Sequence, residues 1–263
     1  MKVSIVPAKN FMNKSNLTGG FTCNPYVGCM HGCIYCFAKF MLRGRDKADV
    51  WGKFVDIKEF PNYSIPRNTG EAGLYLSTVT DCYQPLELEA KATRKVLEAV
   101  KESNLLVTIL TKSKHVLRDL DLFKSMKSIE VGFSIALSDE FAEVMEPFAS
   151  KPSERLEALK TLKANNITTF VFVAPIIPYI TDVFSIIDAA KPYADYFMFD
   201  SLNLKHPDNI KGILNYVNTY HPELKTKFED IFLRHDHTFY DNLRTDIIAY
   251  MNRENLKYKY IYD

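Results

Sequence analysis

The chain has 263 residues, 47% of them apolar, and a formal net charge of +1. This composition allows one large domain with a substantial core, and it excludes the molecule-wide basic field that marks many nucleic-acid-binding proteins. Five cysteines, three of them between residues 29 and 36, indicate a reducing compartment rather than a disulfide scaffold. We find neither a signal peptide nor an apolar run that could span a membrane, and expect a cytoplasmic protein.

Strands and helices are predicted to alternate along most of the chain. The predicted strands cover residues 21–26, 74–80, 105–111, 129–137, 168–175 and 193–199. The predicted helices cover residues 35–42, 86–100, 117–123 and 141–144, a segment starting at an N-cap Ser153, and residues 183–190. This alternation is typical of βαβ units and a parallel sheet. About six such units are compatible with a partial barrel or with an open doubly wound sheet.

The remaining segments are expected to surround this core of about residues 20–205. Residues 1–20 are predicted to be a leader that packs before the first strand. Residues 43–70 have no steady period, and we expect a loop-rich excursion with a short strand that helps to cover the site. Residues 206–263 are predicted to be an extension with helices at 224–232 and 240–251 and an edge strand at 257–262. We interpret residues 1–263 as a single domain.

Three cysteines lie in one short loop, in the pattern CxxxCxxC. Cys29, Cys33 and Cys36 are separated by spacers that let a curled chain bring three thiolates to one ligand, and glycines precede the first two. Three thiolates can hold three irons of a [4Fe–4S] cluster and leave the fourth iron open to a small molecule. The alternative is a zinc site that also uses Cys23.

The stretch NPYVGCMHGCIYCFA resembles the cluster loop of the radical S-adenosylmethionine (SAM) superfamily, and within it the spore photoproduct lyase-like group. The resemblance implies a partial (β/α)6 TIM-type barrel of parallel strands with a helical C-terminal extension. It implies a [4Fe–4S] cluster and SAM as cofactors, with SAM bound at the open iron. An electron from a reductant such as flavodoxin or ferredoxin then splits SAM into methionine and a 5′-deoxyadenosyl radical, which takes hydrogen from a substrate.

Polar residues follow the predicted strands, where sites of parallel α/β folds form. The resemblance implies roles for several of them. The residues that we expect to bind SAM are Tyr35, Thr80, Lys112, Ser134, Arg155 and Ile177. Lys112 matches a lysine that pairs with the SAM carboxylate, and Ser134 lies on a face of small residues with Gly132 and Ala136. The alternative for Lys112 is an exposed surface lysine. The alternative for Ser134 is a small face that packs against bulky neighbours. Arg155 could equally pair with Glu146.

Cys82 is the residue on which the specific reaction depends. It resembles the cysteine that donates a hydrogen atom in spore photoproduct lyase, and we predict Cys82 and Tyr35 as catalytic residues. The match is imperfect, because Phe37 stands where the lyase has a hydrogen-relaying tyrosine. The alternative is a small buried thiol. His31 is expected to be solvated or to lie behind the ligands, and Arg118 with Asp119 to form a structural pair.

We therefore predict a radical SAM enzyme, with lyase-type chemistry as one option. Radical modification of a small molecule, a peptide or RNA is the alternative, because a fold does not fix a substrate. Outside enzymes, a redox sensor or electron carrier with a fully ligated cluster would also use the cysteines. The sequence leaves the substrate open, with nucleic acid among the candidates, and indicates no membrane partner.

Overall fold

The computed structural model describes residues 1–15, 19–46, 48–66, 69, 72–204 and 207–262. Within these residues, one large sheet has the strand order β11-β10-β9-β8-β7-β6-β3-β2. All neighbours are parallel except β2 and β3. The strands are β2 (Asn13–Ser15), β3 (Gly20–Cys23), β6 (Gly73–Leu76), β7 (Leu106–Thr111), β8 (Ile129–Ser134), β9 (Thr168–Ile176), β10 (Tyr196–Ser201) and β11 (Tyr258–Ile261).

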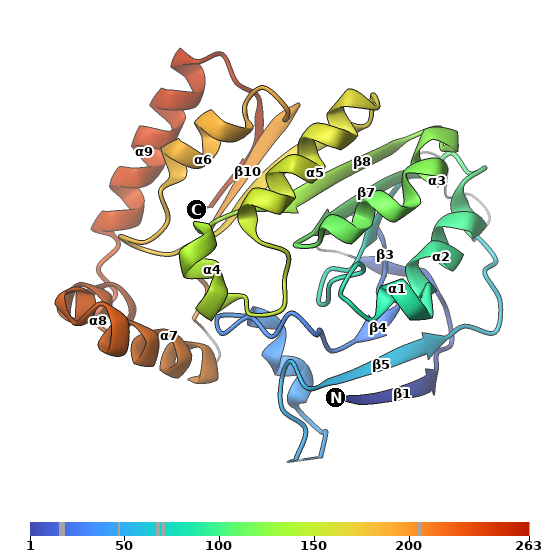
Figure 1. The fold of residues 1–263 in the computed structure, drawn as a ribbon, viewed down its shortest axis with the longest axis horizontal. Coiled ribbons are helices and arrows are strands. Elements are labelled where there is room, and N and C mark those ends of the chain that lie inside the picture. Colours follow the sequence, from blue (N-terminus) through green and yellow to red (C-terminus); the bar gives the residue numbers. More distant parts are fainter. Residues whose placement is uncertain (16–18, 47, 67–68, 70–71, 205–206, 263) are drawn as a thin grey trace.

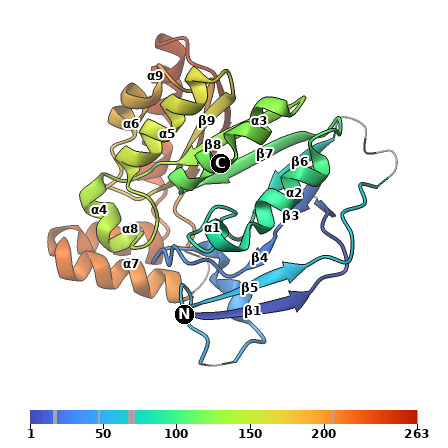
Figure 2. The same ribbon diagram turned by 45° about the vertical axis from the view of Figure 1, so that its right-hand side comes forward.

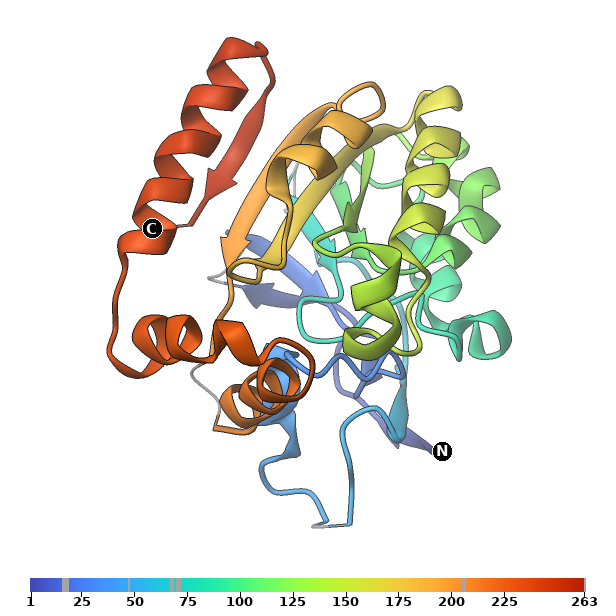
Figure 3. The same ribbon diagram turned by 60° about the vertical axis from the view of Figure 1, so that its left-hand side comes forward.

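The strands from β3 to β10 stand in chain order across the sheet, which curves as an open partial barrel (Figure 1). A doubly wound sheet would need a reversal of strand order at its centre, so the order confirms the predicted barrel type. The helices along it are α1 (Glu87–Ala90), α2 (Ala92–Val100), η2 (Lys114–Asp119), α3 (Leu120–Ser125), α4 (Asp139–Met145), α5 (Pro152–Ala164) and α6 (Val183–Ala190). Figures 2 and 3 show α2, α3, α5 and α6 on the outer side of the curve.

Alternation along the strands decides which side chains meet these helices. Side chains at odd positions of β7, β8 and β9 pack outward with Val96, Leu97, Leu159 and Leu162 in the main core. Even positions face the concave side. There the small face packs against a bulky neighbour at Gly132, which is the expected alternative to free space for a ligand, because a Cβ built on Gly132 would lie 2.2 Å from the ring of Phe170. That ring, which stacks on Tyr196 at 4.9 Å, fills the place where Gly132 has no side chain.

A second, smaller sheet lies below the barrel and has the order β1-β5-β4. Its strands are β1 (Lys2–Pro7), β5 (Phe54–Glu59) and β4 (Tyr26–Val27). The expected leader is therefore a strand parallel to the one in the 43–70 excursion. The strand predicted over residues 21–26 is also divided, because β3 ends at Cys23 and β4 joins the other sheet. Pro25, which has no N–H to donate, stands at the division.

The extension contains more helix than predicted. It consists of α7 (Pro207–Tyr220), η3 (Pro222–Leu224), α8 (Lys225–Leu233), α9 (Thr238–Arg253) and the edge strand β11. The sequence analysis missed α7, whereas α8, α9 and β11 were expected. The hydroxyl of Tyr240 on α9 donates to the carbonyl of Ile176 at 2.9 Å and accepts from the N–H of Leu202 at 3.2 Å. These bonds fasten the extension to the carboxyl ends of β9 and β10.

Two local details differ from expectation. α5 begins at Pro152, and its N-cap is Lys151 rather than Ser153. The Ser153 hydroxyl donates to Asp139 at 2.6 Å, which joins α5 to the start of α4. Among the described residues, no helix is long and apolar enough to cross a membrane.

Candidate functional site

The cysteine loop connects β4 to the short helix η1 (Phe37–Leu42) at the mouth of the barrel. Gly28 and Gly32 have φ angles of +87° and +64°, a region that favours glycine. A Cβ on Gly28 would lie 2.6 Å from the carbonyl oxygen of Phe54. Glycine is therefore required at this position both for the turn and for the close approach of the neighbouring strand β5.

The three loop thiols lie beside one another, those of Cys29 and Cys33 buried and that of Cys36 partly buried. Burial raises the pKa of Cys29, of Cys36 and of Cys33, the last to about 12, and each thiolate would raise the pKa of a neighbouring one. Cys23 lies apart in the main core, where burial raises its pKa to about 12 and Lys58 is the charged neighbour. The structure therefore does not bring Cys23 to the loop as a fourth zinc ligand.

Residues after β6 hold the loop on both sides of Cys29. The Gln84 side chain accepts from the N–H of Met30 at 2.8 Å and points its amide nitrogen at the carbonyl of Gly28, 3.4 Å away. The hydroxyl of Thr80 donates to the same Gly28 carbonyl at 2.5 Å. Thr80 was predicted to contact SAM, but its hydroxyl hydrogen is donated to the backbone of the loop. Gln84 was not among the predicted site residues, because no motif or spacing in the sequence singles it out.

Asp81 joins the loop to the ends of two strands. Its carboxylate accepts from the Thr111 hydroxyl and the Lys112 N–H, each at 2.7 Å, and lies 3.4 Å from Nδ1 of His31. The His31 side chain is only 2% exposed, so the interpretation as a solvated residue is wrong. Burial lowers the pKa of His31.

A buried network links the loop to β8 and α5. The Tyr35 hydroxyl donates to Glu146, and Arg155 forms an ion pair with the same carboxylate. Arg155 also donates to the carbonyls of Ser134 and Ser150, each at 2.8 Å. Burial acts to raise the pKa of Glu146, but Arg155, Lys112 and the hydrogen bonds outweigh it and hold that pKa below its usual value. The predicted site residues Tyr35, Arg155 and Ser134 therefore meet in this network.

Lys112 and Ile177 complete the group around the loop. The Lys112 ammonium lies 5.8 Å from the centre of the Tyr35 ring, and its charge acts to lower the pKa of Cys33 and Cys36. It forms no hydrogen bond or ion pair with any residue that the structure describes, so its charge is available to a ligand. Ile177 is fully buried in the same apolar cluster as Cys33 and Tyr35. The Ser134 hydroxyl donates to the carbonyl of Ala174 at 2.7 Å and can still accept a bond.

Cys82 and Phe37 lie away from this group. Cys82 is fully buried in the main core, and burial holds the pKa of its thiol well above its usual value, so the thiol keeps its proton. Phe37 is 51% exposed and packs against Phe40, with ring centres 6.4 Å apart.

The chemistry of the loop fits an iron–sulfur cluster. Among the described residues, no three His, Cys, Asp or Glu side chains are arranged to hold a single metal ion. A cube of four irons takes each thiolate on a different iron, so its ligands surround it instead of meeting at one point. Two buried atoms beside the cysteines, Nε2 of His31 and Nε1 of Trp51, have no nitrogen or oxygen partner within the described residues. Both fit a loop that closes around a further polar group.

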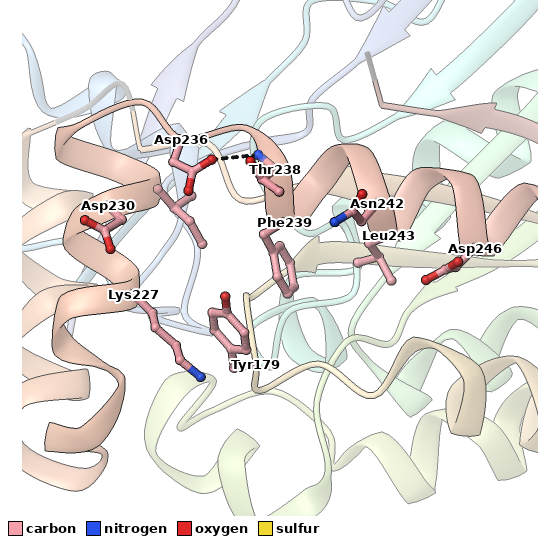
Figure 4. A pocket seen from close by; sticks show the side chains of 10 residues that line it. Tyr179, Lys227, Asp230, Asp236, Thr238, Phe239, Asn242, Leu243 and Asp246 are labelled. Atoms are coloured by element: carbon pink, nitrogen blue, oxygen red, sulfur yellow. Dashed lines mark hydrogen bonds between the residues drawn. The ribbon is translucent and has the colours of Figure 1, made fainter.

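A cavity of about 360 Å³ lies in the extension rather than at the loop (Figure 4). Its wall includes the rings of Tyr179 and Phe239, 4.8 Å apart, with Lys227 over Tyr179 and Asp246 along α9. None of the predicted site residues lines it, so it is separate from the cysteine site.

Comparisons with known proteins agree with this geometry. A family description, "Radical SAM superfamily", matches residues 23–184. An uncharacterized protein of Methanocaldococcus jannaschii is 37% identical over 219 residues, which are 82% of this chain and 84% of that protein. A "Radical SAM Nalpha-GlyT isomerase" of Pseudomonas phage M6 is 24% identical over 161 residues, 59% of this chain and 32% of that protein.

A solved structure of a spore photoproduct lyase variant, with AdoMet and dinucleoside spore photoproduct bound, has a similar fold. The TM-score is 0.61 at 16% identity, over 90% of this chain and 79% of that one. Another lyase structure, with a TM-score of 0.54, is matched over 85% of this chain and 58% of its own length. At this identity the likeness establishes the fold alone.

Proposed function

We propose that Cys29, Cys33 and Cys36 hold the [4Fe–4S] cluster of this protein. The premise is that the chain belongs to the radical SAM superfamily, whose enzymes use such a cluster and SAM. The observation that carries the proposal is the convergence of three thiols, two of them buried, on one glycine-bent loop, with Cys23 held elsewhere. Three protein thiolates leave one iron for SAM.

With the cluster bound and reduced, one electron splits SAM into methionine and a 5′-deoxyadenosyl radical. The ammonium of Lys112 pairs with the carboxylate of SAM, because it is a free cation beside the loop. Ile177 supplies apolar surface for the adenine, and the Ser134 hydroxyl accepts a hydrogen bond from the bound molecule.

Tyr35, Arg155 and Thr80 serve this site by holding it in shape. The hydroxyls of Tyr35 and Thr80 donate to Glu146 and to Gly28, and three N–H groups of Arg155 donate to Glu146 and to two backbone carbonyls, which supports a positioning role over a SAM contact. The hydrogen-donor role of Cys82 stays a prediction. Its protonated thiol suits a donor, but core side chains enclose it. A Cys82→Ala variant with unchanged products would contradict that role.

We infer hydrogen abstraction from a substrate as the reaction class, in a reducing cytoplasm with a flavodoxin or ferredoxin as the electron source. The lyase structures named above, which hold a dinucleoside spore photoproduct, suggest a nucleic-acid substrate, and a small molecule, a peptide or RNA is the alternative. A redox sensor or electron carrier is less well supported, because it leaves the Lys112 charge without a ligand.

The test is anaerobic reconstitution followed by iron analysis, electron paramagnetic resonance (EPR) with and without SAM, and assay of 5′-deoxyadenosine after reduction with dithionite. We expect about four irons per chain, an EPR signal that changes with SAM, and release of 5′-deoxyadenosine. Cys33→Ala is expected to lose all three. Cys23→Ala is the matched control, because it removes another buried thiol and is expected to keep them.

Two results would contradict the proposal. A reduced cluster whose signal ignores SAM and yields no 5′-deoxyadenosine would favour the sensor or carrier. Equal loss of iron in Cys23→Ala and Cys33→Ala would mean that the cluster ligands have been assigned wrongly.

A further inference from the structure

The excursion packs directly against the cysteine loop through residues 51–54. Trp51, the sole tryptophan of the chain, is buried in one apolar cluster with Cys29 and Phe54, and Cys36 packs against that cluster. The next residue, Gly52, touches the loop backbone, since a Cβ built there would lie 2.8 Å from the Cα of Gly32. The segment is therefore part of the wall of the cysteine site.

The indole nitrogen of Trp51 is buried and has no hydrogen-bond partner among the described residues. An indole N–H can only donate, and a buried donor without an acceptor is costly, so native structures almost always supply one. Cys36 packs against the apolar cluster that contains Trp51, so its sulfur is a neighbour of the indole N–H.

We propose that the indole N–H of Trp51 donates a hydrogen bond to the thiolate sulfur of Cys36 and so tunes the cluster. The proposal rests on the proposed function, because Cys36 is a thiolate acceptor only as a cluster ligand. The distance along the chain, from residue 36 to residue 51, explains why no cysteine motif contains this residue.

A hydrogen bond to a ligand sulfur withdraws negative charge from the cluster and makes its reduction easier. Losing the bond shifts the reduction potential to more negative values, which works against the electron transfer that SAM cleavage needs. Trp51 is thus a positioning and tuning residue, and it acts through Cys36 rather than by touching the substrate.

The test compares the reduction potentials of wild type, Trp51→Phe and Phe54→Leu by EPR-monitored redox titration. Trp51→Phe keeps an aromatic ring but removes the donor. We expect the ratio of reduced to oxidised cluster at a fixed potential to fall by up to about tenfold, which corresponds to about 59 mV for one electron. Phe54→Leu is the matched control: its ring contacts Trp51 edge-on, with centres 6.2 Å apart, and has no donor to lose. An equal shift in both variants, or none in Trp51→Phe, would overturn the proposal.

A second measurement needs no variant. Because the chain has a single tryptophan, labelling tryptophan with ¹⁵N at the indole marks one atom. Pulsed EPR of the reduced cluster is expected to show a ¹⁵N coupling that unlabelled protein lacks, and its absence would refute the hydrogen bond. The proposed function fails separately, if the wild type binds no cluster or releases no 5′-deoxyadenosine.

Discussion

Two buried triads of tyrosine, glutamate and arginine flank the cysteine loop, and they differ in one instructive way. The first triad is Tyr26, Glu87 and Arg118, and the second triad is Tyr35, Glu146 and Arg155. In each, the tyrosine hydroxyl donates to the glutamate, which pairs with the arginine. Tyr26 lies just before the cysteines and Tyr35 lies among them, so both ends of the loop are tied to the barrel by the same chemistry.

The difference is in the balance of charge. Around the first triad, the carboxylates of Glu87 and Asp119 face the guanidinium groups of Arg118 and Arg94, and Arg94 also pairs with the exposed carboxylates of Glu98 and Asp121. Both guanidinium groups of the first network are therefore paired with carboxylates, and this network serves the fold. The second triad pairs Glu146 with Arg155, and beside it the ammonium of Lys112 has no ion-pair partner among the described residues. The second network thus keeps one positive charge for an anionic ligand.

The largest expected effect comes from removing the glutamate charge in each triad. Glu146→Gln removes the one carboxylate with which Arg155, whose side chain is 0% exposed, pairs among the described residues. We expect the free energy of unfolding of the apoprotein to fall by about 3–5 kcal/mol. Arg118 is 20% exposed and keeps Asp119, so Glu87→Gln is expected to cost only about 1–3 kcal/mol. Urea denaturation measures both.

The prediction depends on which variant loses more unfolding free energy, Glu146→Gln or Glu87→Gln. Equal losses, or a greater loss in Glu87→Gln, would show that the two networks do not differ as the charge balance indicates. If either variant unfolds outright, comparison of its soluble yield and thermal midpoint with the other still ranks the pair.

The next effect concerns the ammonium charge of Lys112. Replacing Lys112 with methionine keeps the aliphatic chain and removes the ammonium, so we expect SAM affinity to fall by about 10- to 100-fold, the value of a charged hydrogen bond of about 1.5–3 kcal/mol. Titration of the EPR signal with SAM measures the affinity. Lys114→Met is the matched control, because Lys114 is half exposed and pairs with Glu154 on the surface. Similar losses in both variants would remove Lys112 from the site.

The sequence predicted the parts of this site that are local in the chain. The alternation of strands and helices, the cysteine loop and Lys112 could all be found from short patterns. The structural pairing of Arg118 with Asp119 was also expected and is present. The pairing of Arg155 with Glu146 was one of two alternatives that the sequence left open, and it is present. What the sequence could not reveal is the pairing of Arg118 with Glu87, because Glu87 reaches the loop only after β6 has joined the sheet.

The errors have the same origin. β1 and β5 pair across about fifty residues, and neither short strand has a pattern that specifies a partner so distant. Gly132 suggested free space on β8, but the ring that fills it belongs to β9. Trp51 was one aromatic residue in a segment without periodicity, and only folding sets it against Cys36.

The smallest effect tests where the first triad ends at the surface. Arg94 extends that triad outward, and its hydrogen bond to Asp121 lowers the pKa of this carboxyl to about 2. Because the pKa is lower in the folded than in the unfolded chain, the pair adds stability above about pH 4 and loses it as the pH falls toward 2. The Asp121 side chain is 59% exposed, so solvent screening limits the gain to about 0.2–1 kcal/mol. Urea denaturation of the apoprotein should show Asp121→Asn less stable than wild type by this amount at pH 7 and a narrowing difference below pH 4. If the difference in unfolding free energy between wild type and Asp121→Asn widens in acid, Asp121 does not pair with Arg94. The network around the first triad then ends at Asp119.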